Sequence, residues 1–257
     1  MKEEFIKIAN AVREAVMPVA GTPEAREIVG KGADGAASFK IDRTAENAAL
    51  NAIKDLGLKF NILTEETGFV DGGGTETIVI DPVDGSRNAI NGLPMYSFSI
   101  AVGSRGLSGM REGLVMDLQS GRVYFAEKGL GATCDNRSIR TREYNERGSI
   151  FLLNLGANAS TSVLDFARRS AIVRSYGSAA LEMCLVAEGR ADLYVNKSID
   201  SAHSMRIVDI AAAALILREA GGEIYDTTGN LLDMELRIDD RKGVIAVGDK
   251  NLRRMVV

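Results

Sequence analysis

Apolar positions recur every three to four residues near the N-terminus, a spacing that predicts two amphipathic helices. The first covers about residues 3–20 and the second about residues 42–56. The glycine-rich stretch at 21–38 lacks this period and is expected to form a long mobile loop. Within it, residues 30–35 match the letters of a dinucleotide-binding pattern. Because we expect no strand before them and no helix after them, we interpret them as a linker, with contact of Lys31 or Asp34 to a phosphate or metal as the alternative.

Short apolar runs rich in β-branched residues follow the second helix, and turn residues separate them, as is typical of strands. In the first half of the chain these runs lie at 60–63, 77–80, 97–103, 113–118 and 122–127. Such close spacing predicts helices packed on a largely antiparallel sheet.

Strands and helices alternate in the second half, after an irregular charged stretch at 135–148. We expect strands at 150–155, 172–176, 191–196, 223–225 and 244–247, and helices at 178–188, 205–220 and 251–255. The order of elements changes near residues 132–136. The sequence therefore predicts an α+β subdomain at 1–133 and an α/β subdomain at 134–257.

Composition and charge narrow the class of protein. A chain of 257 residues with 46% hydrophobic and 26% charged residues is typical of an ordinary globular protein. It has no apolar run of membrane-spanning length, and its charged N-terminus does not resemble a signal peptide. A net charge of −4, without a basic stripe, disfavours nucleic-acid binding. Cys134 and Cys184 lack paired spacing, which fits a reducing compartment. We expect a cytoplasmic protein without membrane or nucleic-acid partners.

The single histidine, His203, excludes several chemistries. A serine-histidine-acid triad would have to use it, and a zinc site with several histidines is impossible. Catalysis would therefore depend on carboxylates, hydroxyls, cationic side chains and bound metal.

Two carboxylates stand three residues apart in the turn that follows the strand at 77–80. Pro82 fixes the backbone after Asp81, and Gly85 allows a sharp turn after Asp84. A second acidic pair, Glu65-Glu66, ends the preceding strand. Carboxylates this close repel each other unless a cation or a proton lies between them. The pattern indicates a site for a hard metal ion; an ordinary capped turn and a solvated strand end are the alternatives.

Two further carboxylates lie at helix starts. Asp209 lies one turn inside a helix that is otherwise apolar, so it needs a cation or a strong hydrogen-bond partner. Capping the amides of its own helix is the alternative. Asp42 stands at the start of the helix expected at about 42–56, where N-capping is the simplest interpretation.

These segments resemble, in order, the inositol monophosphatase superfamily, which includes fructose-1,6-bisphosphatases and nucleotide 3′-phosphatases. The motifs are Glu65-Glu66, Asp81-Pro82-Val83-Asp84-Gly85-Ser86 and Val208-Asp209-Ile210-Ala211-Ala212. Segments 32–35, 88–97 and 205–209 are most similar to the archaeal type, whose members often act on both inositol phosphates and fructose 1,6-bisphosphate. The resemblance implies an α+β fold built as a layered α-β-α-β-α sandwich.

The resemblance also implies a site for two or three Mg²⁺ ions. Glu65, Asp81 and the Val83 carbonyl would hold one ion, and Asp81, Asp84 and Asp209 would hold a second. All of these ligands are oxygens, which Mg²⁺ prefers. Such ions clamp an ester phosphate and activate a water molecule for attack.

Catalytic and substrate-binding residues follow from the same resemblance. Asp42, Glu65 and Ser86 would be catalytic, with Ser86 and Asp42 helping to take the proton of the attacking water. Residues implied to bind substrate are Gly85, Ser86, Arg87, Gly177, Ser178, Ala179 and Arg206. Of these, Arg206 would meet a second phosphate. Three departures from the family pattern stand out: Thr64; Arg87 with Asn91, after the turn; and Ala202, where archaeal relatives commonly carry an arginine.

We therefore expect a Mg²⁺-dependent phosphomonoesterase for small sugar or polyol phosphates, with inositol 1-phosphate first and fructose 1,6-bisphosphate second. One alternative is a phosphatase for 3′-phosphoadenosine 5′-phosphate, although the chain has no tryptophan and few other aromatics for base stacking. A non-catalytic phosphosugar-binding regulator is another. The family also leads us to expect a homodimer.

Overall fold

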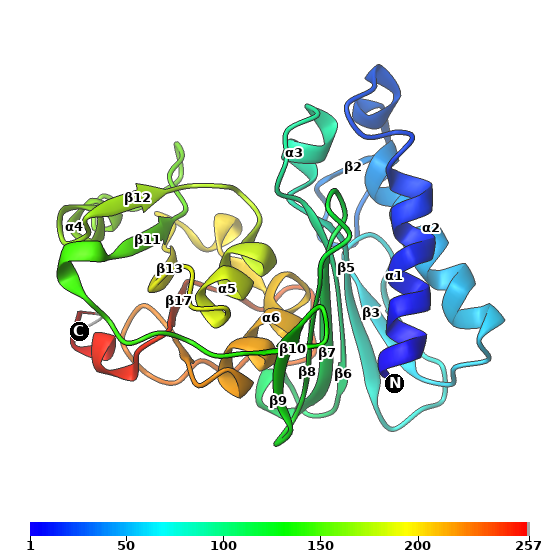
Figure 1. Ribbon diagram of the computed structural model, residues 1–257. Coiled ribbons are helices and arrows are strands. Elements are labelled where there is room, and N and C mark those ends of the chain that lie inside the picture. The colour runs from blue at the N-terminus through cyan, green and yellow to red at the C-terminus, as the bar shows by residue number, and fades with distance from the viewer. Residues whose placement is uncertain (256–257) are drawn as a thin grey trace.

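Helices and sheets alternate in five layers in the computed structural model, which describes residues 1–255 (Figure 1). Helices α1 (Lys2–Val16) and α2 (Lys40–Asp55) cover one face of an eight-stranded sheet. Helices α5 (Ala179–Ala187) and α6 (Ile207–Glu219) lie between that sheet and a five-stranded one. Helix α4 (Val163–Arg168) packs on the outer face of the second sheet. This arrangement confirms the expected α-β-α-β-α sandwich.

The larger sheet is antiparallel except where β3 and β5 run parallel to each other. Its strands, in spatial order, are β10 (Arg137–Ile139), β9 (Gly131–Cys134), β8 (Val123–Glu127), β7 (Met110–Asp117), β6 (Ser97–Gly103), β5 (Thr77–Asp84), β3 (Asn61–Thr64) and β4 (Gly68–Val70). Side chains of its central strands alternate between the two cores. On β5, for example, Ile78 and Ile80 face α1 and α2, whereas Val79 faces α6.

The smaller sheet begins after an irregular segment. Its strands, in spatial order, are β12 (Ile172–Arg174), β11 (Ile150–Leu153), β13 (Leu193–Asn196), β17 (Val244–Val247) and β15 (Glu223–Tyr225). Because β10 still belongs to the first sheet, the change from one sheet to the other lies between Ile139 and Ile150. The division of the chain at residue 133 stays a prediction.

Several short elements complete the fold. They are α3 (Ser86–Ile90), the paired strands β14 (Met205–Arg206) and β16 (Arg241–Lys242), and the 3₁₀ helices η1 (Pro23–Arg26), η2 (Leu107–Gly109), η3 (Glu146–Gly148), η4 (Ser201–His203) and η5 (Lys250–Met255). Of the helices within residues 1–255, none has both the length and the apolar character needed to cross a membrane.

The stretch at 21–38 contains regular structure, so the expectation of a loop was wrong there. Strand β1 (Ile28–Lys31) pairs antiparallel with β2 (Ala37–Phe39), and the helix that follows begins at Lys40. All four residues of β1 are exposed, so the strand has no buried face. Without a buried face, a strand shows no alternation of apolar and polar residues in the sequence.

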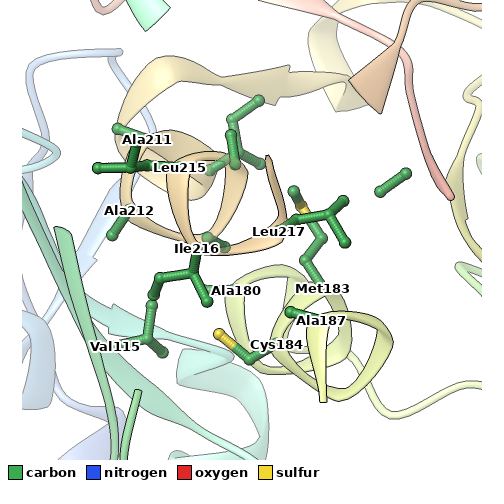
Figure 2. Close-up of a cluster of buried hydrophobic side chains, with 14 of the residues drawn as sticks. Val115, Ala180, Met183, Cys184, Ala187, Ala211, Ala212, Leu215, Ile216 and Leu217 are labelled. Carbon is green, nitrogen blue, oxygen red and sulfur yellow. The ribbon is translucent and has the colours of Figure 1, made fainter. Parts of the chain in front are cut away.

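Helix α6 is buried around its whole circumference. Every residue from Ile207 to Leu217 is buried, because one side of the helix packs on the larger sheet and another on α5. Figure 2 shows alanine and other small side chains where these elements meet, among them Val115, Ala180, Cys184, Ala187 and Ala212. A helix that is apolar all round is typical of such an interior position.

The backbone of α6 passes closely over β7 at Gly113. A Cβ atom at this position would lie 2.9 Å from Ala212 Cα and 3.2 Å from Ala212 Cβ. Because these are atoms of a buried helix, a side chain at Gly113 would push α6 away from the sheet. Gly156, in contrast, has open space around its Cα.

We expect Gly113→Ala to lower the free energy of unfolding by about 1–3 kcal/mol, because overpacking displaces α6. Urea denaturation measures this change. Gly156→Ala is the control, with an expected change below about 0.5 kcal/mol. Equal stability of the two variants would show that α6 does not constrain Gly113.

Candidate active site

A β-bulge in β5 aims two carboxylates into the site. The pairing of β5 with β6 slips by one residue between Asp81 and Asp84, so the strand continues past Ile80 instead of ending there. Pro82 lies in this bulge, where a residue without an N–H group is tolerated. The Asp81 carboxylate accepts a hydrogen bond from the Val83 amide at 3.1 Å. Bulges commonly redirect side chains beside active sites.

Gly85 makes the turn after the bulge. Its φ of 87° lies in the left-handed region, and a Cβ atom would lie 2.9 Å from the Met95 carbonyl oxygen. Only glycine fits such a position without strain. Helix α3 starts at the next residue, Ser86, whose hydroxyl donates to the Val83 carbonyl oxygen at 2.8 Å.

Three of the expected metal ligands meet at one point. Glu65, Asp81 and Asp209 each offer a carboxylate oxygen, and these oxygens lie within 4.8 Å of one another. The parallel pairing of β3 and β5 sets Thr64 beside Ile80, so the next residues of both strands reach the same edge of the sheet. Asp209 arrives from the first turn of α6. A set of carboxylate oxygens fits Mg²⁺.

Burial makes the ionised form of these three carboxyl groups unfavourable unless a cation lies beside them. Burial, together with the neighbouring carboxylates, raises the pKa of Glu65 above its usual value, although the Arg206 guanidinium opposes the shift. The same causes raise the pKa of Asp81 more strongly. Protons and cations therefore compete for these groups.

Arg206 supplies a positive charge inside the cluster. Its Nη2 lies 2.6 Å from Glu65 Oε1 and 2.7 Å from Asp209 Oδ1, and its side chain is only 9% exposed. Its backbone amide also donates to Asp209 Oδ2 at 2.7 Å, so Asp209 does cap its own helix. The sequence led us to expect Arg206 beside a second phosphate; the structure places its side chain against the carboxylates of Glu65 and Asp209.

Asp84 lies apart from the three-carboxylate cluster and reaches the start of α5. Its oxygens accept hydrogen bonds from the amides of Ala179 and Ala180 at 3.1 and 2.9 Å, and from the hydroxyls of Ser97 and Ser178. Burial raises the pKa of Asp84 even though these donors oppose the shift. The carboxylate thus joins the larger sheet to α5, and its part in metal binding stays a prediction.

Asp42 lies in the first turn of α2, not at its N-cap, because the helix begins two residues earlier. Burial raises its pKa to about 6, while the nearby Ser86 hydroxyl opposes the shift. Within residues 1–255, no hydrogen-bond donor serves Asp42 Oδ1. Asp42, Ser86 and Arg87 line a cavity of about 360 Å³, where Arg87 lies over the Phe39 ring at 5.0 Å.

The cluster opens into an adjoining cavity of about 270 Å³, whose wall includes residues that sequence reasoning missed. These are Asn154, Glu182, Tyr194 and Arg241, in addition to the expected Gly177 and Ala179. A polar residue at the end of an apolar strand was the available signal for Asn154. Burial raises the pKa of Glu182 to about 7, and its carboxylate accepts the Gly177 amide at 3.1 Å.

A buried carboxylate on α2 supports the end of β3. Glu46 accepts hydrogen bonds from the Thr67 amide at 3.0 Å, from the Thr67 hydroxyl at 2.9 Å and from the Thr64 hydroxyl. Thr64, which departs from the family pattern, therefore has a partner within the fold. These bonds fix the backbone on both sides of Glu65.

The sequence model of the inositol monophosphatase family matches residues 1–256. This chain belongs to the inositol monophosphatase family. Its members are Mg²⁺-dependent phosphatases, in agreement with the acidic cluster.

Curated relatives and a solved structure agree with this membership. The chain is 33% identical to a fructose-1,6-bisphosphatase/inositol-1-monophosphatase from Methanothermobacter thermautotrophicus, over 98% of this chain and 93% of the relative. It is 30% identical to a bifunctional NADP phosphatase/NAD kinase from Methanococcus maripaludis. That match covers 100% of this chain but only 48% of the relative. A crystal structure of an inositol monophosphatase–fructose 1,6-bisphosphatase superposes with a TM-score of 0.89 at 29% identity, covering 100% of this chain and 98% of the other.

We expect Mg²⁺ to raise the melting temperature, and to do so more strongly as the pH rises through about 6 to 7. Because burial raises the pKa of Asp84 to about 6 and that of Glu65 to about 7, the metal-free protein has lost their contribution to stability once the pH has risen through this range and both have ionised. Mg²⁺ then replaces the lost protons. Thermal unfolding in EDTA and in Mg²⁺, at several pH values, measures the effect.

Glu65→Gln should remove most of this Mg²⁺ effect, because it removes one charged ligand. Asp239→Asn is the control: that carboxylate is exposed and pairs with Arg237. A Mg²⁺ effect of the same size in Glu65→Gln and in the unaltered protein would contradict the assignment.

Proposed function

We propose that this chain is a Mg²⁺-dependent phosphomonoesterase for small sugar or polyol phosphates. Inositol 1-phosphate is the first candidate and fructose 1,6-bisphosphate the second. The carboxylate cluster of Glu65, Asp81 and Asp209 carries this proposal, because it opens into a cavity beside the Gly85 turn. The names of the archaeal relatives support the same substrates.

The charge of the cavity supports more than one metal ion. Five carboxylates and two guanidinium groups line it, which leaves an excess of three negative charges when all are ionised. A phosphate ester carries about two negative charges near neutral pH and would be repelled. Two divalent cations would reverse the excess, and a third would increase the attraction. We therefore propose two or three Mg²⁺ ions.

Asp81 would be shared between two of these ions. Glu65 and the Val83 carbonyl would complete the ligands of one, and Asp84 and Asp209 those of the other. Mg²⁺ held by these residues would polarise the phosphoryl group and make a water molecule easier to deprotonate.

Asp42 and Ser86 would remove the proton from the attacking water. Asp42 is buried, one of its oxygens lacks a donor within residues 1–255, and its raised pKa makes it a stronger base than an exposed aspartate. The Ser86 hydroxyl lies in the same cavity and now donates to Val83. Rotation away from that carbonyl would let it pass a proton to Asp42.

Neutral hydrogen-bonding groups line the part of the cavity where the sugar or polyol part of the substrate would bind. Asn154 and Tyr194 line the cavity, and Gly177 and Ala179 contribute the turn before α5. Ser178 would contribute indirectly, because its hydroxyl donates a hydrogen bond to the Asp84 carboxylate and helps to orient it. Hydroxyls and amides of this kind suit the hydroxyl groups of a polyol or sugar.

A nucleotide substrate is the second candidate, because two relatives at 30–31% identity are named NADP phosphatase/NAD kinase. Arg87 and the Phe39 ring, stacked beside Ser86, would then face the nucleotide. A purely regulatory sugar-phosphate binder is disfavoured, since such a protein would not need Asp42 and Ser86 beside the cluster.

We further propose a homodimer in a reducing cytoplasm. Leu155, just after β11, Leu164 on α4 and Ile172 on β12 are 39–48% exposed, and such apolar side chains would suit a contact between subunits. Cys134 and Cys184 are both free and buried. Light scattering distinguishes a dimer from a monomer.

Phosphate release with and without Mg²⁺ tests the function. Inositol 1-phosphate, fructose 1,6-bisphosphate, 3′-phosphoadenosine 5′-phosphate and NADP form the panel. We expect Mg²⁺-dependent release from the first two, and a loss of at least about 100-fold in kcat for Asp84→Asn and Asp209→Asn. Full activity in both variants would contradict the metal assignment, and preference for the nucleotides would favour the second candidate.

The Asp42→Asn variant tests proton removal separately from metal binding. We expect kcat to fall by about 10²–10⁴-fold, because a general base is lost, while Mg²⁺ still raises the melting temperature. In the unaltered enzyme, activity should fall as the pH drops below about 6, where Asp42 becomes protonated. An unchanged kcat in Asp42→Asn would exclude Asp42 as the base.

A further inference from the structure

The single histidine of the chain lines the wall of the main cavity. His203 is the last residue of the 3₁₀ helix η4, and it borders the same cavity of about 270 Å³ as the carboxylate cluster. A cavity of this size is at the small end of the range for ligand sites. A substrate whose phosphate lies on the cluster therefore comes within reach of the wall that His203 forms.

An aspartate orients the imidazole ring of this histidine. Asp200 Oδ1 lies 2.8 Å from His203 Nδ1 and accepts the His203 backbone amide at 3.2 Å. The Ser198 hydroxyl donates to the His203 carbonyl oxygen at 2.8 Å, which fixes the backbone of the same turn. Within residues 1–255, His203 Nε2 has no hydrogen-bond partner. The carboxylate thus holds one ring nitrogen and leaves the other free, an arrangement that suits proton transfer.

The charged groups near the imidazole favour its protonated form. Asp200 stays ionised, because the hydrogen bond from His203 lowers the pKa of its carboxyl. Two arginines line the same cavity from the neighbouring strands, Arg206 on β14 and Arg241 on β16, and oppose a further positive charge. Asp34 pairs with both, at 3.0 and 2.8 Å, and so offsets part of their charge.

The proposed reaction needs a second proton transfer, to the leaving alcohol. Attack forms a bond from the water oxygen to phosphorus and breaks the bond from phosphorus to the alcohol oxygen. The electron pair of the broken bond stays on that oxygen, which must gain a proton to leave as a neutral alcohol. Attacking and leaving oxygens are roughly in line, so the group that serves the alcohol must lie across the phosphorus from the group that serves the water.

Asp42 and His203 lie on different sides of the turn at Gly85 and Ser86. Asp42 lines the cavity of about 360 Å³, and His203 lines that of about 270 Å³. Glu65, Gly85 and Ser86 line both cavities and so form their common border. A phosphate at this border would have Asp42 on one side and His203 on the other.

Other groups on the wall of the smaller cavity are poorer proton donors. Burial raises the pKa of Tyr194 well above its usual value. The two oxygens of Glu182 accept the backbone amides of Tyr176 and Gly177, each at 3.1 Å. Guanidinium groups do not release protons in proteins, and carboxyls that bind metal do so without a proton. Histidine is the side chain that ordinarily changes its charge near neutral pH, and His203 has a free ring nitrogen.

We propose that His203 is the general acid of the reaction and donates its Nε2 proton to the leaving alcohol oxygen, with Asp200 as its positioning residue. The inference rests on the proposed function and deepens it by completing the proton balance. Asp42 gains a proton from the attacking water, His203 loses one to the alcohol, and exchange with solvent restores both. The active form therefore has Asp42 ionised and His203 protonated.

Two aryl phosphates that differ in the basicity of the leaving oxygen test this role. Phenyl phosphate releases an oxygen of pKa about 10, whereas the nitro group makes the leaving oxygen of 4-nitrophenyl phosphate much less basic and less dependent on an acid. Neither ring carries a hydroxyl group that His203 could bind. We expect His203→Gln to lower kcat/KM by about 10²-fold for phenyl phosphate and by less than about threefold for 4-nitrophenyl phosphate. Inositol 1-phosphate should lose at least as much as phenyl phosphate, because its leaving oxygen is more basic.

Three further variants separate proton donation from a structural effect. Ser201→Ala is the matched control, since Ser201 is exposed in the same turn and does not line the cavity; both kcat/KM values should stay unchanged. Asp200→Asn keeps a capping side chain but removes the charge, so we expect a smaller loss of about tenfold, for phenyl phosphate alone. Because His203 is 49% exposed, added imidazole should reach the gap in His203→Ala and restore hydrolysis of phenyl phosphate.

The outcomes distinguish this inference from the proposed function. Equal losses for the two aryl esters in His203→Gln, or no loss for either, would overturn the role of His203. A protein that hydrolyses the aryl esters but no sugar, polyol or nucleotide phosphate would refute the proposed substrates, and the aryl esters would still decide the role of His203. A protein that releases phosphate from no ester would refute the proposed function, and the general acid with it.

Discussion

Crowding of negative charge in a buried space is the constraint on which the site depends. Glu65, Asp81 and Asp209 bring oxygens within 4.8 Å of one another, and burial raises the pKa of Glu65 and Asp81. Such a cluster persists only with protons, a cationic side chain or metal ions to offset the repulsion. Arg206 provides that charge in the structure described here, at 2.6–2.7 Å from two of the three carboxylates. A metal ion bound at this cluster would therefore compete with the Arg206 guanidinium for the same carboxylates.

The five-layer fold holds the carboxylates in place from three directions. Parallel strands β3 and β5 end at one edge of the larger sheet, the bulge turns Asp81 and Asp84 toward the cavity, and α6 brings Asp209 from the middle layer. Asp84 then joins the sheet to the start of α5 through hydrogen bonds to two backbone amides. The same carboxylate would thus couple the relative position of the two sheets to the geometry of the metal site.

The sequence was sufficient to predict that Glu65, Asp81 and Asp209 lie together and to predict most of the helices and strands. A carboxylate directly after an apolar strand, or inside an apolar helix as Asp209 is, costs free energy to bury unless it has a partner. Such a position therefore indicates a functional or capping role. Contacts made through tertiary structure gave no such signal: Asp84 meets an amide 95 positions away, and Arg206 meets Asp34 172 positions away. The β1–β2 hairpin was missed because its first strand is exposed on both faces. Asp42 was misplaced at a helix N-cap because helix ends are poorly determined by sequence.

Crystals soaked in Mn²⁺, with anomalous scattering recorded at the manganese edge, test this competition for the carboxylates most directly. Manganese shares the preference of Mg²⁺ for carboxylate oxygens and reveals its own position. We expect anomalous peaks bounded by Glu65, Asp81 and Asp209, with the Arg206 guanidinium withdrawn from Glu65. No peak at this position, with Arg206 still bonded to Glu65 and Asp209, would contradict it.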